Sequence, residues 1–416
     1  MKKNSFKLAF ASAALLTLSH TLWAGDITQG KTKAAACAGC HGINGIGLSE
    51  EFPNLAGQKQ AYIIKQLTAF KNGSRKDPTM NAMAASLSNK DIADLAAYFS
   101  SLVQTDTQSS TSENKIMSTR ASNREFPESI FISMKKSATI ETFPQQQSWP
   151  GGPNMLYTAI TPDKKMLLST SPSSNTVYIF NTQNGKQLAI IKTGKAPKGV
   201  KVSPDGKQAY ISNQGSADIT VINLKSLQVS NTIKVKKGPH NVRFTNDGKL
   251  AYVTLQGGDG LGVIDTQKQK LIRVIPVPGI TGPHNLDLSA DEKTAFVRDF
   301  VHHVAVVDLT TGKVNKIITV GNGHGGIDVF PNGQYAATAA IGDDYISIID
   351  TRTLESRDIK IGTASHGIRV SKNSQWLYVT LPKENAIAVI NTRTMAVEAR
   401  IASGKFPFWI AVHGNP

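Results

Sequence analysis

The sequence predicts a multidomain chain in which a small all-α domain precedes a larger all-β domain. Helical spacing of apolar residues is confined to the first quarter of the chain, where Ile92, Leu95 and Phe99 form one stripe. A polar segment without apolar periodicity follows at 104–115 and is typical of a flexible linker. The rest of the chain repeats a short β-rich element at intervals of about 42 residues. A length of 416 residues also suits two domains better than one.

The first 24 residues have the pattern of a cleaved secretory signal. Lys2, Lys3 and Lys7 precede an apolar run at 8–18 that is too short to span a bilayer as a stable helix. The segment ends at the small residue Ala24, which suits signal peptidase. We therefore expect residues 1–24 to be removed, the mature protein to be periplasmic, and no transmembrane segment to remain. A retained membrane anchor is the alternative.

Composition limits the class of partner. The net charge is +16, from 46 Lys and Arg against 30 Asp and Glu. Residues 25–103 are nearly balanced, so the excess lies on the repeating part of the chain. A positive excess favours anionic partners such as a small anionic substrate, an acidic redox protein or a lipid surface. No segment has the pattern of a nucleic-acid-binding module.

The only two cysteines, Cys37 and Cys40, form a C-x-x-C-H motif with His41. Two cysteines are too few for a disulfide-stabilised scaffold in a chain of this length, and too few for a Cys-rich zinc or iron–sulfur site. The motif spacing lets both thiols add to the vinyl groups of one haem and sets the imidazole beneath the iron. A thioredoxin-like pair is the alternative, but it needs a preceding strand, and residues 30–36 have a helical composition. The motif therefore predicts one covalent haem c with His41 as an axial ligand.

The second axial ligand is expected later in the same domain. No histidine lies between His41 and His240, but Met80 and Met83 occur in the intervening stretch. A thioether ligand stabilises reduced iron and raises its potential. Ordinary core packing is the alternative for either methionine.

Residues 25–103 resemble the class I c-type cytochromes. The pieces that carry the resemblance are Lys33–Gly42, Phe52–Gln58, Tyr62–Leu67 and Leu87–Phe99. The resemblance implies that Met80 ligates the iron, with Met83 as the fallback, and that the Pro53 carbonyl supports the axial His41. It also implies electron transfer, with periplasmic redox proteins as partners.

Two helices of this domain are also predicted from local signals. Ser88 followed by Asp91 fits a capped helix start, and the apolar stripe beyond it should pack on the helix carrying Cys37. A further amphipathic helix over 60–70 is expected to stop at Asn72-Gly73.

The second part of the chain repeats a strand that ends in Asn or Asp. Its six copies end at Asn181, Asn223, Asp265, Asp308, Asp350 and Asn391, and this period with several strands per repeat is typical of propeller blades. Six blades are complete, and a lone strand follows at 408–413. We expect it to close a seventh blade whose third and fourth strands are 129–134 and 138–143, so that no edge stays open. Residues 116–416 resemble the YVTN-type propellers, which implies a seven-bladed fold but no particular chemistry.

Histidines recur just before the first strand of a blade. His240, His284 and His366 share this position, and His324 lies one residue before it in another blade. We expect these four side chains near the central channel, where imidazoles could bind copper or another metal or redox cofactor. Histidines without a metal are the alternative. Two residues into the same strands the sequence has charged residues, which predict a water-filled channel: Lys201, Arg243, Asp287, Asp328 and Arg369.

The combination of domains distantly resembles the nitrite reductases that carry a d-type haem. Those enzymes have eight blades and this sequence predicts seven, which argues against a d-type haem. The leading hypothesis is a periplasmic monohaem cytochrome that exchanges electrons with its own propeller, the propeller acting as an oxidoreductase module on a small anion or a metal centre. The alternative is a non-enzymatic electron-transfer protein whose propeller is a docking platform for other proteins.

Overall fold

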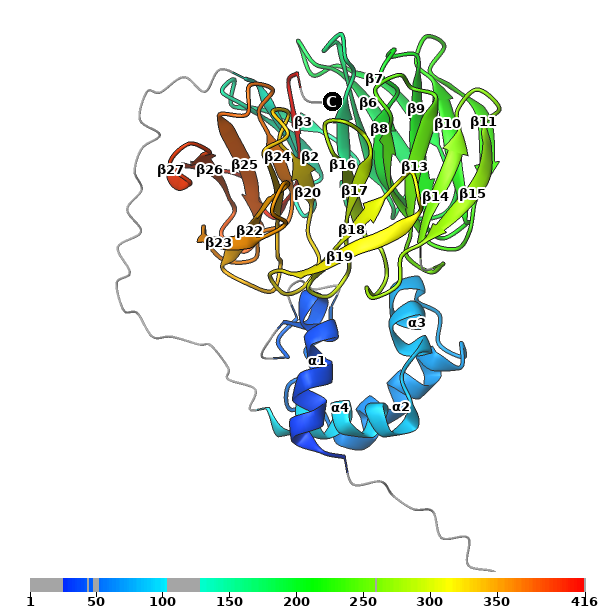
Figure 1. Cartoon of the computed structure of the whole chain (residues 1–416), viewed down its shortest axis with the longest axis vertical. Helices are drawn as coiled ribbons and strands as arrows, with labels where there is room; N and C mark the ends of the chain where they lie inside the picture. Colours follow the sequence, from blue (N-terminus) through cyan, green and yellow to red (C-terminus); the bar gives the residue numbers. More distant parts are fainter. Residues whose placement is uncertain (1–24, 43–44, 48–51, 103–127, 259, 415–416) are drawn as a thin grey trace, which may run out of the picture.

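The computed structural model of the chain describes residues 25–42, 45–47, 52–102, 128–258 and 260–414. Within these ranges, four helices precede twenty-eight strands in seven sheets (Figure 1). The predicted fold class, a small all-α domain followed by a seven-bladed all-β propeller, is confirmed. The expected signal peptide, 1–24, and linker, 104–115, lie outside the described residues. Across these ranges, every helix is too short or too polar to cross a membrane.

The helices begin where the sequence offers capping side chains. They are α1 (Ile27–His41), α2 (Gln60–Lys71), α3 (Pro78–Ala85) and α4 (Asn89–Ser101). The Asp26 carboxylate accepts hydrogen bonds from the first backbone N–H groups of α1, and Asp77 caps α3 in the same way. Ser88 and Asp91 form the predicted reciprocal capping box at the start of α4.

Helices α1 and α4 cross at very close range. Gly30 makes this possible, because a Cβ atom at that position would lie 2.1 Å from the Asp94 carbonyl oxygen. The predicted stripe on α4, including Leu95 and Phe99, packs with Ala34 of α1 and Ile63 of α2 in one buried cluster. This packing fixes the direction of α1, whose last turn carries the C-x-x-C-H motif.

The propeller consists of seven four-stranded antiparallel sheets around a channel. The innermost strands, β28, β4, β8, β12, β16, β20 and β24, contact one another in sequence and close the ring. The strands of the six blades that follow one another along the chain are β4 (Thr158–Ile160), β5 (Met166–Ser171), β6 (Thr176–Asn181), β7 (Gln187–Lys192), β8 (Pro197–Val202), β9 (Gln208–Asn213), β10 (Asp218–Asn223), β11 (Gln228–Lys234), β12 (Pro239–Phe244), β13 (Leu250–Leu255), β14 (Gly260–Asp265), β15 (Lys270–Pro276), β16 (Asn285–Leu288), β17 (Thr294–Arg298), β18 (His303–Asp308), β19 (Lys313–Thr319), β20 (Ile327–Val329), β21 (Tyr335–Thr338), β22 (Tyr345–Asp350), β23 (Ser356–Lys360), β24 (Ile368–Val370), β25 (Trp376–Leu381), β26 (Ala386–Asn391) and β27 (Ala396–Ala402).

The remaining blade joins the two ends of the propeller. Its strand order is β28 (Pro407–Val412), β1 (Ile130–Met134), β2 (Thr139–Phe143) and β3 (Gln147–Pro150). The predicted closure by the last strand is therefore confirmed, but the strand positions within the blade were wrong by one. The two predicted segments are its second and third strands, and β3 is the fourth. That strand is short and polar except for Trp149, so it carries no strand pattern that the sequence could show.

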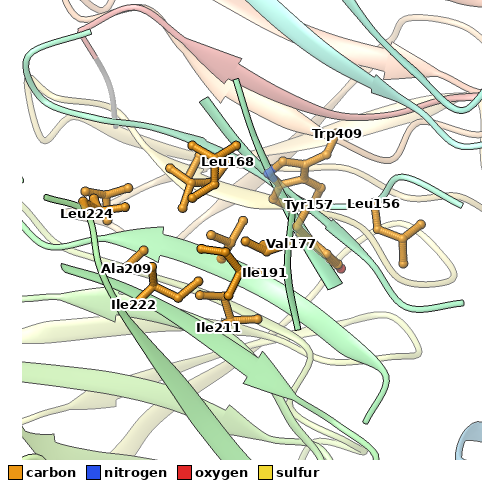
Figure 2. Packing of buried hydrophobic residues seen from close by; sticks show 14 of the residues in the cluster. Leu156, Tyr157, Leu168, Val177, Ile191, Ala209, Ile211, Ile222, Leu224 and Trp409 are labelled. Carbon is orange, nitrogen blue, oxygen red and sulfur yellow. The ribbon is translucent and has the colours of Figure 1, made fainter. Parts of the chain in front are cut away.

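The core of the ring lies between neighbouring blades. One buried cluster joins the blade of β4 to β7 with the blade of β8 to β11. Figure 2 shows Leu168, Ile191 and Ile211 among the side chains of this layer. Since each blade buries its apolar faces only against its neighbours, the loops at the two ends of the ring are free to carry other chemistry.

Candidate functional site

The C-x-x-C-H motif occupies the last turn of α1. Cys40 and His41 are buried and Cys37 is half-buried, and all three line one cavity. Burial raises the pKa of both thiols to about 12. Unmodified thiols in this position would stay protonated at neutral pH, which does not suit a reactive thiolate pair.

The His41 ring has one nitrogen engaged and one available. Its Nδ1–H donates a hydrogen bond to the Pro53 carbonyl oxygen, with 2.8 Å between the two atoms. A carbonyl oxygen can only accept, so Nδ1 carries the proton and Nε2 carries a lone pair. Within the described ranges, the buried Nε2 atom has no hydrogen-bond partner. An oriented imidazole with one open nitrogen is the usual arrangement of a metal-ligating histidine.

Met80 and Met83 lie on α3 and line the same cavity as His41. The Met80 N–H donates to the Asp77 carboxylate, with a distance of 2.8 Å. The Asn81 amide donates to the carbonyl oxygens of Phe70 and Arg75, which ties α3 to the end of α2. The two methionines are therefore held at the cavity by several local bonds. Both remain candidate ligands.

The cavity extends from the helical domain into the mouth of the propeller. Its volume is about 600 Å³, which is within the range of cofactor sites. The helical side contributes the motif, Ile63, Leu67 and both methionines, and the propeller side contributes His240, His284 and His324. Figure 1 shows the carboxyl end of α1 and α3 against one end of the ring. The predicted cytochrome site and the predicted histidine site therefore share one cavity.

The two domains touch beside the motif. A Cβ atom on Gly39 would lie 3.0 Å from the Gly323 Cα atom and 3.3 Å from Nδ1 of His324. Lys135 spans the same junction, because its Nζ atom lies 5.6 Å from the ring centre of Phe52 in the helical domain and 5.4 Å from that of Phe406 in the propeller.

The four propeller histidines of the predicted site, His240, His284, His324 and His366, lie close together at this end of the channel. His284, His324 and His366 each offer one ring nitrogen, and these three atoms lie within 4.8 Å of one another. The His240 ring packs on His284, with 3.9 Å between ring centres. Phe300 stacks on His324 at 4.5 Å and forms an apolar wall. His302 and His303 form a separate pair at the start of β18, where the His303 ring lies 3.0 Å from the Asp299 carboxylate.

Burial keeps these imidazoles neutral. It lowers the pKa of His240, His284 and His324 well below the ordinary value for histidine. Burial also lowers the pKa of His366 to about 3, aided by the charges of Lys135 and Lys198 and against the hydrogen bond to the Phe408 carbonyl oxygen. Neutral imidazoles are the form that binds a metal.

The hydrogen bonds separate His240 from the other three. Its Nδ1 atom is 3.0 Å from the His284 carbonyl oxygen, and its Nε2 atom is 3.4 Å from the Tyr157 hydroxyl. Both nitrogens of His284, Nδ1 of His324 and Nε2 of His366 are buried without a hydrogen-bond partner among the residues that the structure describes.

A buried arginine that the sequence reasoning missed holds the loop before His324. Arg298 donates to the carbonyl oxygens of Gly321 and Gly323, and its other terminal nitrogen is 3.0 Å from the Asp299 carboxylate. Burial lowers the pKa of Arg298 to about 10. The signal available in the sequence was the charged pair Arg298-Asp299 at the end of a blade's second strand.

The charged residues of the inner strands form a buried network. Arg243 contacts Asp287 at 2.8 Å and Asp328 at 3.8 Å, and Arg369 contacts Asp328 at 2.5 Å. The sequence predicted a water-filled channel from five charged residues, and the structure joins these four of them in ion pairs between blades.

Comparison with known proteins finds two families in one chain. The cytochrome c family profile matches residues 27–103, and the YNCE-like beta-propeller profile matches residues 145–280. Cytochrome c-554(548) of Halomonas halodenitrificans is 44% identical over 81 residues, which cover 19% of this chain and 98% of that protein. Cytochrome c4 of Pseudomonas aeruginosa is 44% identical over 87 residues, covering 21% of this chain and 42% of that protein.

A further relative and a solved structure are also similar to this chain. The thiosulfate dehydrogenase electron acceptor of Stutzerimonas stutzeri is 36% identical over 111 residues, covering 26% of this chain and 51% of that protein. The chain thus spans about half the length of several relatives that it matches. Among solved structures, Kuenenia stuttgartiensis hydrazine synthase matches with a TM-score of 0.58 and 18% identity over 62% of this chain and 90% of that chain. This likeness concerns the fold alone.

Proposed function

Because residues 27–103 belong to the cytochrome c family and the chain continues as a YNCE-like β-propeller, we propose that this protein is an exported monohaem c-type cytochrome that exchanges electrons with its own propeller. The observation that carries the proposal is the shared cavity, in which the C-x-x-C-H motif and the propeller histidines face the same space. Redox proteins of the periplasm are the proposed external partners, and residues 1–24 are the proposed export signal.

The residues around the cavity fit a haem c. Cys37 and Cys40 would hold it through thioether bonds, and His41 would offer its unpartnered Nε2 atom to the iron. Met80 is the proposed second axial ligand, with Met83 as the fallback. Bound there, the haem iron would supply a one-electron couple. The Pro53 carbonyl orients His41, and the apolar side chains Ile63 and Leu67 keep water from the site.

On the propeller side, the proposed role is that of an oxidoreductase module. The histidines supply neutral metal-binding groups, and Lys135 and Lys198 add positive charge to the same cavity. A small anionic substrate suits this charge. The substrate would meet the propeller histidines beside Gly39, which places the chemistry next to the cytochrome motif.

The test is a pyridine haemochrome assay with redox titration of the purified full chain. We expect one haem per chain with both vinyl groups saturated and a reversible one-electron couple. Cys37→Ser and Cys40→Ser should each give the spectrum of a haem with a single thioether bond, whereas Ala35→Ser in the same helix should not. Non-covalent haem in the wild-type chain, or double attachment in either cysteine variant, would contradict the proposal.

A second candidate function is a docking platform for other proteins. The specific observation in its favour is a row of exposed apolar side chains on the outer strands of three successive blades: Leu188, Ile190, Val229 and Ile272. In that case the propeller would bind no metal, and Ile190→Lys with Ile272→Lys would slow electron exchange with a periplasmic partner without changing the haem spectrum.

A further inference from the structure

Three histidines from three successive blades converge at the mouth of the propeller channel. His284 precedes β16, His324 lies in the loop before β20, and His366 lies just before β24. Their exposed fractions are 3%, 7% and 0%. One nitrogen from each lies within 4.8 Å of the others. Nitrogen ligands about 2.0–2.1 Å from one ion lie at most about 4 Å apart, so binding would draw the three rings slightly closer together.

Most of the ring nitrogens at this convergence have no hydrogen-bond partner among the described residues. Four of them are buried without a hydrogen-bond partner in the described ranges. A buried polar atom without a hydrogen-bond partner is destabilising, and such atoms are rare in native proteins. Several of them facing one another, rather than scattered through the core, indicate a missing partner that can accept several lone pairs at once.

His366 is oriented as a metal ligand. Its Nδ1–H donates to the Phe408 carbonyl oxygen, at 3.0 Å, so its lone pair lies on the unpartnered Nε2 atom. His41 has the same arrangement in the cytochrome domain, where Pro53 supplies the carbonyl. In both sites, a backbone carbonyl fixes the tautomer and leaves Nε2 available.

Arg298 supports the position of His324. It binds the carbonyl oxygens of Gly321 and Gly323, and this loop also touches Gly39 of the cytochrome motif. His324 is therefore held beside the cytochrome domain by a buried residue.

We infer that His284, His324 and His366 bind one copper ion whose open coordination position takes a small anion. This inference rests on the proposed function, because it identifies the redox centre of the propeller. His240 is a neighbour and not a ligand, since its two nitrogens face the His284 carbonyl and the Tyr157 hydroxyl.

Two arguments favour copper over zinc. Nitrogen-donor sites bind Cu²⁺ more tightly than Zn²⁺, and the three neutral imidazoles present no thiolate or carboxylate that would change this order. The site also adjoins a one-electron carrier, and copper changes its charge by one electron whereas zinc does not.

The charges around the site favour an anionic ligand at the open coordination position. Three protein ligands leave at least one position open, and the cavity at this point is also lined by Lys135 and Lys198. Two ammonium groups beside a divalent cation attract small anions rather than neutral or cationic ligands.

The first experiment measures metals in the purified full chain after incubation with Cu²⁺ and with Zn²⁺ together, followed by desalting. We expect one copper per chain in addition to haem iron, little zinc, and an electron paramagnetic resonance signal with coupling to imidazole nitrogens. Haem iron alone, zinc alone, or copper without nitrogen coupling would overturn the inference. Haem content is measured in the same sample, so a chain with haem but no copper would contradict only this inference, and a chain without haem would contradict the proposed function.

Variants then test the ligand set. His324→Ala and His366→Asn should each weaken copper binding by roughly tenfold or more. The asparagine amide can still donate to the Phe408 carbonyl, which favours correct folding of that variant. His302→Gln, at a histidine of the separate pair, should bind copper as the wild type does. Equal loss in all three variants, or loss in none, would overturn the assignment.

Azide is the probe for the open position. Adding it to the copper-loaded chain should produce a new azide-to-copper absorption band, and Lys198→Gln should weaken azide binding several-fold while copper content stays the same. The absence of any azide band in a chain that contains nitrogen-coupled copper would refute the anion part of the inference.

Discussion

At the scale of single residues, the site depends on which nitrogen of each histidine is free. His41 and His366 lie in different folds, yet each donates Nδ1–H to a backbone carbonyl oxygen and leaves Nε2 without a partner in the described structure. The carbonyls belong to Pro53 and Phe408. A change that displaces either carbonyl would therefore alter the orientation of the imidazole before it altered its charge.

The choice between the two methionines can be tested by substitution. We expect Met80→Ala to abolish the methionine-to-iron charge-transfer band of the oxidised protein and to lower the reduction potential, because a thioether stabilises reduced iron. Optical redox titration measures both effects. Met83→Ala serves as the matched control and should keep the band; if Met83→Ala loses it and Met80→Ala does not, Met83 is the ligand.

The sequence predicted site residues where chemistry is local, and missed them where it depends on the fold. Cys37, Cys40 and His41 are recognisable because haem attachment needs one short spacing. The propeller histidines could be placed near one another because the repeat aligns them. Arg298 was missed because it binds backbone carbonyl oxygens in the loop that leads to the next blade. Every residue has a backbone carbonyl, so such a partner cannot be recognised from residue types.

At the scale of elements, the crossing of α1 and α4 determines where the cytochrome motif points. Asp94 lies at this crossing, fully buried, and accepts from the Asp26 N–H at 2.9 Å and from the ammonium groups of Lys33 and Lys90 at 3.0 Å. Burial alone would raise the pKa of Asp94. The Asp26 hydrogen bond and the two lysines outweigh it and lower the pKa to about 2.

We therefore expect Asp94→Asn to reduce the free energy of unfolding of the helical domain by about 2 kcal/mol. Because the folded-state pKa is depressed, the wild type should keep this contribution above pH 4 and lose it as the pH falls toward 2, whereas the variant should lack this dependence. Denaturation followed by haem absorption measures the difference. Asp26→Asn, which keeps its backbone N–H, is the control, and an Asp94→Asn variant as stable as the wild type at pH 7 would refute the role.

The elements that the sequence described best were those with a strong period. The capping box and stripe of α4 were predicted residue by residue, and six blades followed from one repeated strand. In the blade that contains β28, the predicted strand positions were wrong by one because β3 was not recognised. Trp149 is the only buried residue of β3, and one residue cannot show the alternation of buried and exposed side chains that predicts a strand.

At the scale of the whole molecule, closure of the ring depends on its last strand. In β28, Ile410 and Val412 join Ile130 and Ile132 of β1 in one buried cluster, and Trp409 packs on Tyr157 of the next blade at 4.5 Å between ring centres. Without β28, the edge of β1 and these apolar faces would meet water.

Truncation after Phe406 tests this closure. We expect the loss of more than about 5 kcal/mol of propeller stability, which is most of the net stability of an ordinary domain, together with aggregation. Soluble yield and urea denaturation followed by tryptophan fluorescence measure it. Removal of only the last two residues, 415–416, is the control and should have little effect. A truncated chain with the wild-type unfolding midpoint would show that closure contributes little.

Because the ring closes with strand β28, the helical domain can fold before the propeller is complete. A hydrogen bond joins Trp409 to Ser133 across 276 positions, so the ring cannot be complete until strand β28 has been synthesised. Contacts of such long sequence separation form slowly, whereas the helices near the amino terminus fold from local contacts. The last turn of α1, which carries Gly39, therefore stays uncovered until the ring closes over it. Under the proposed function, this delay would leave an interval in which haem can be attached to both cysteines before the propeller covers them.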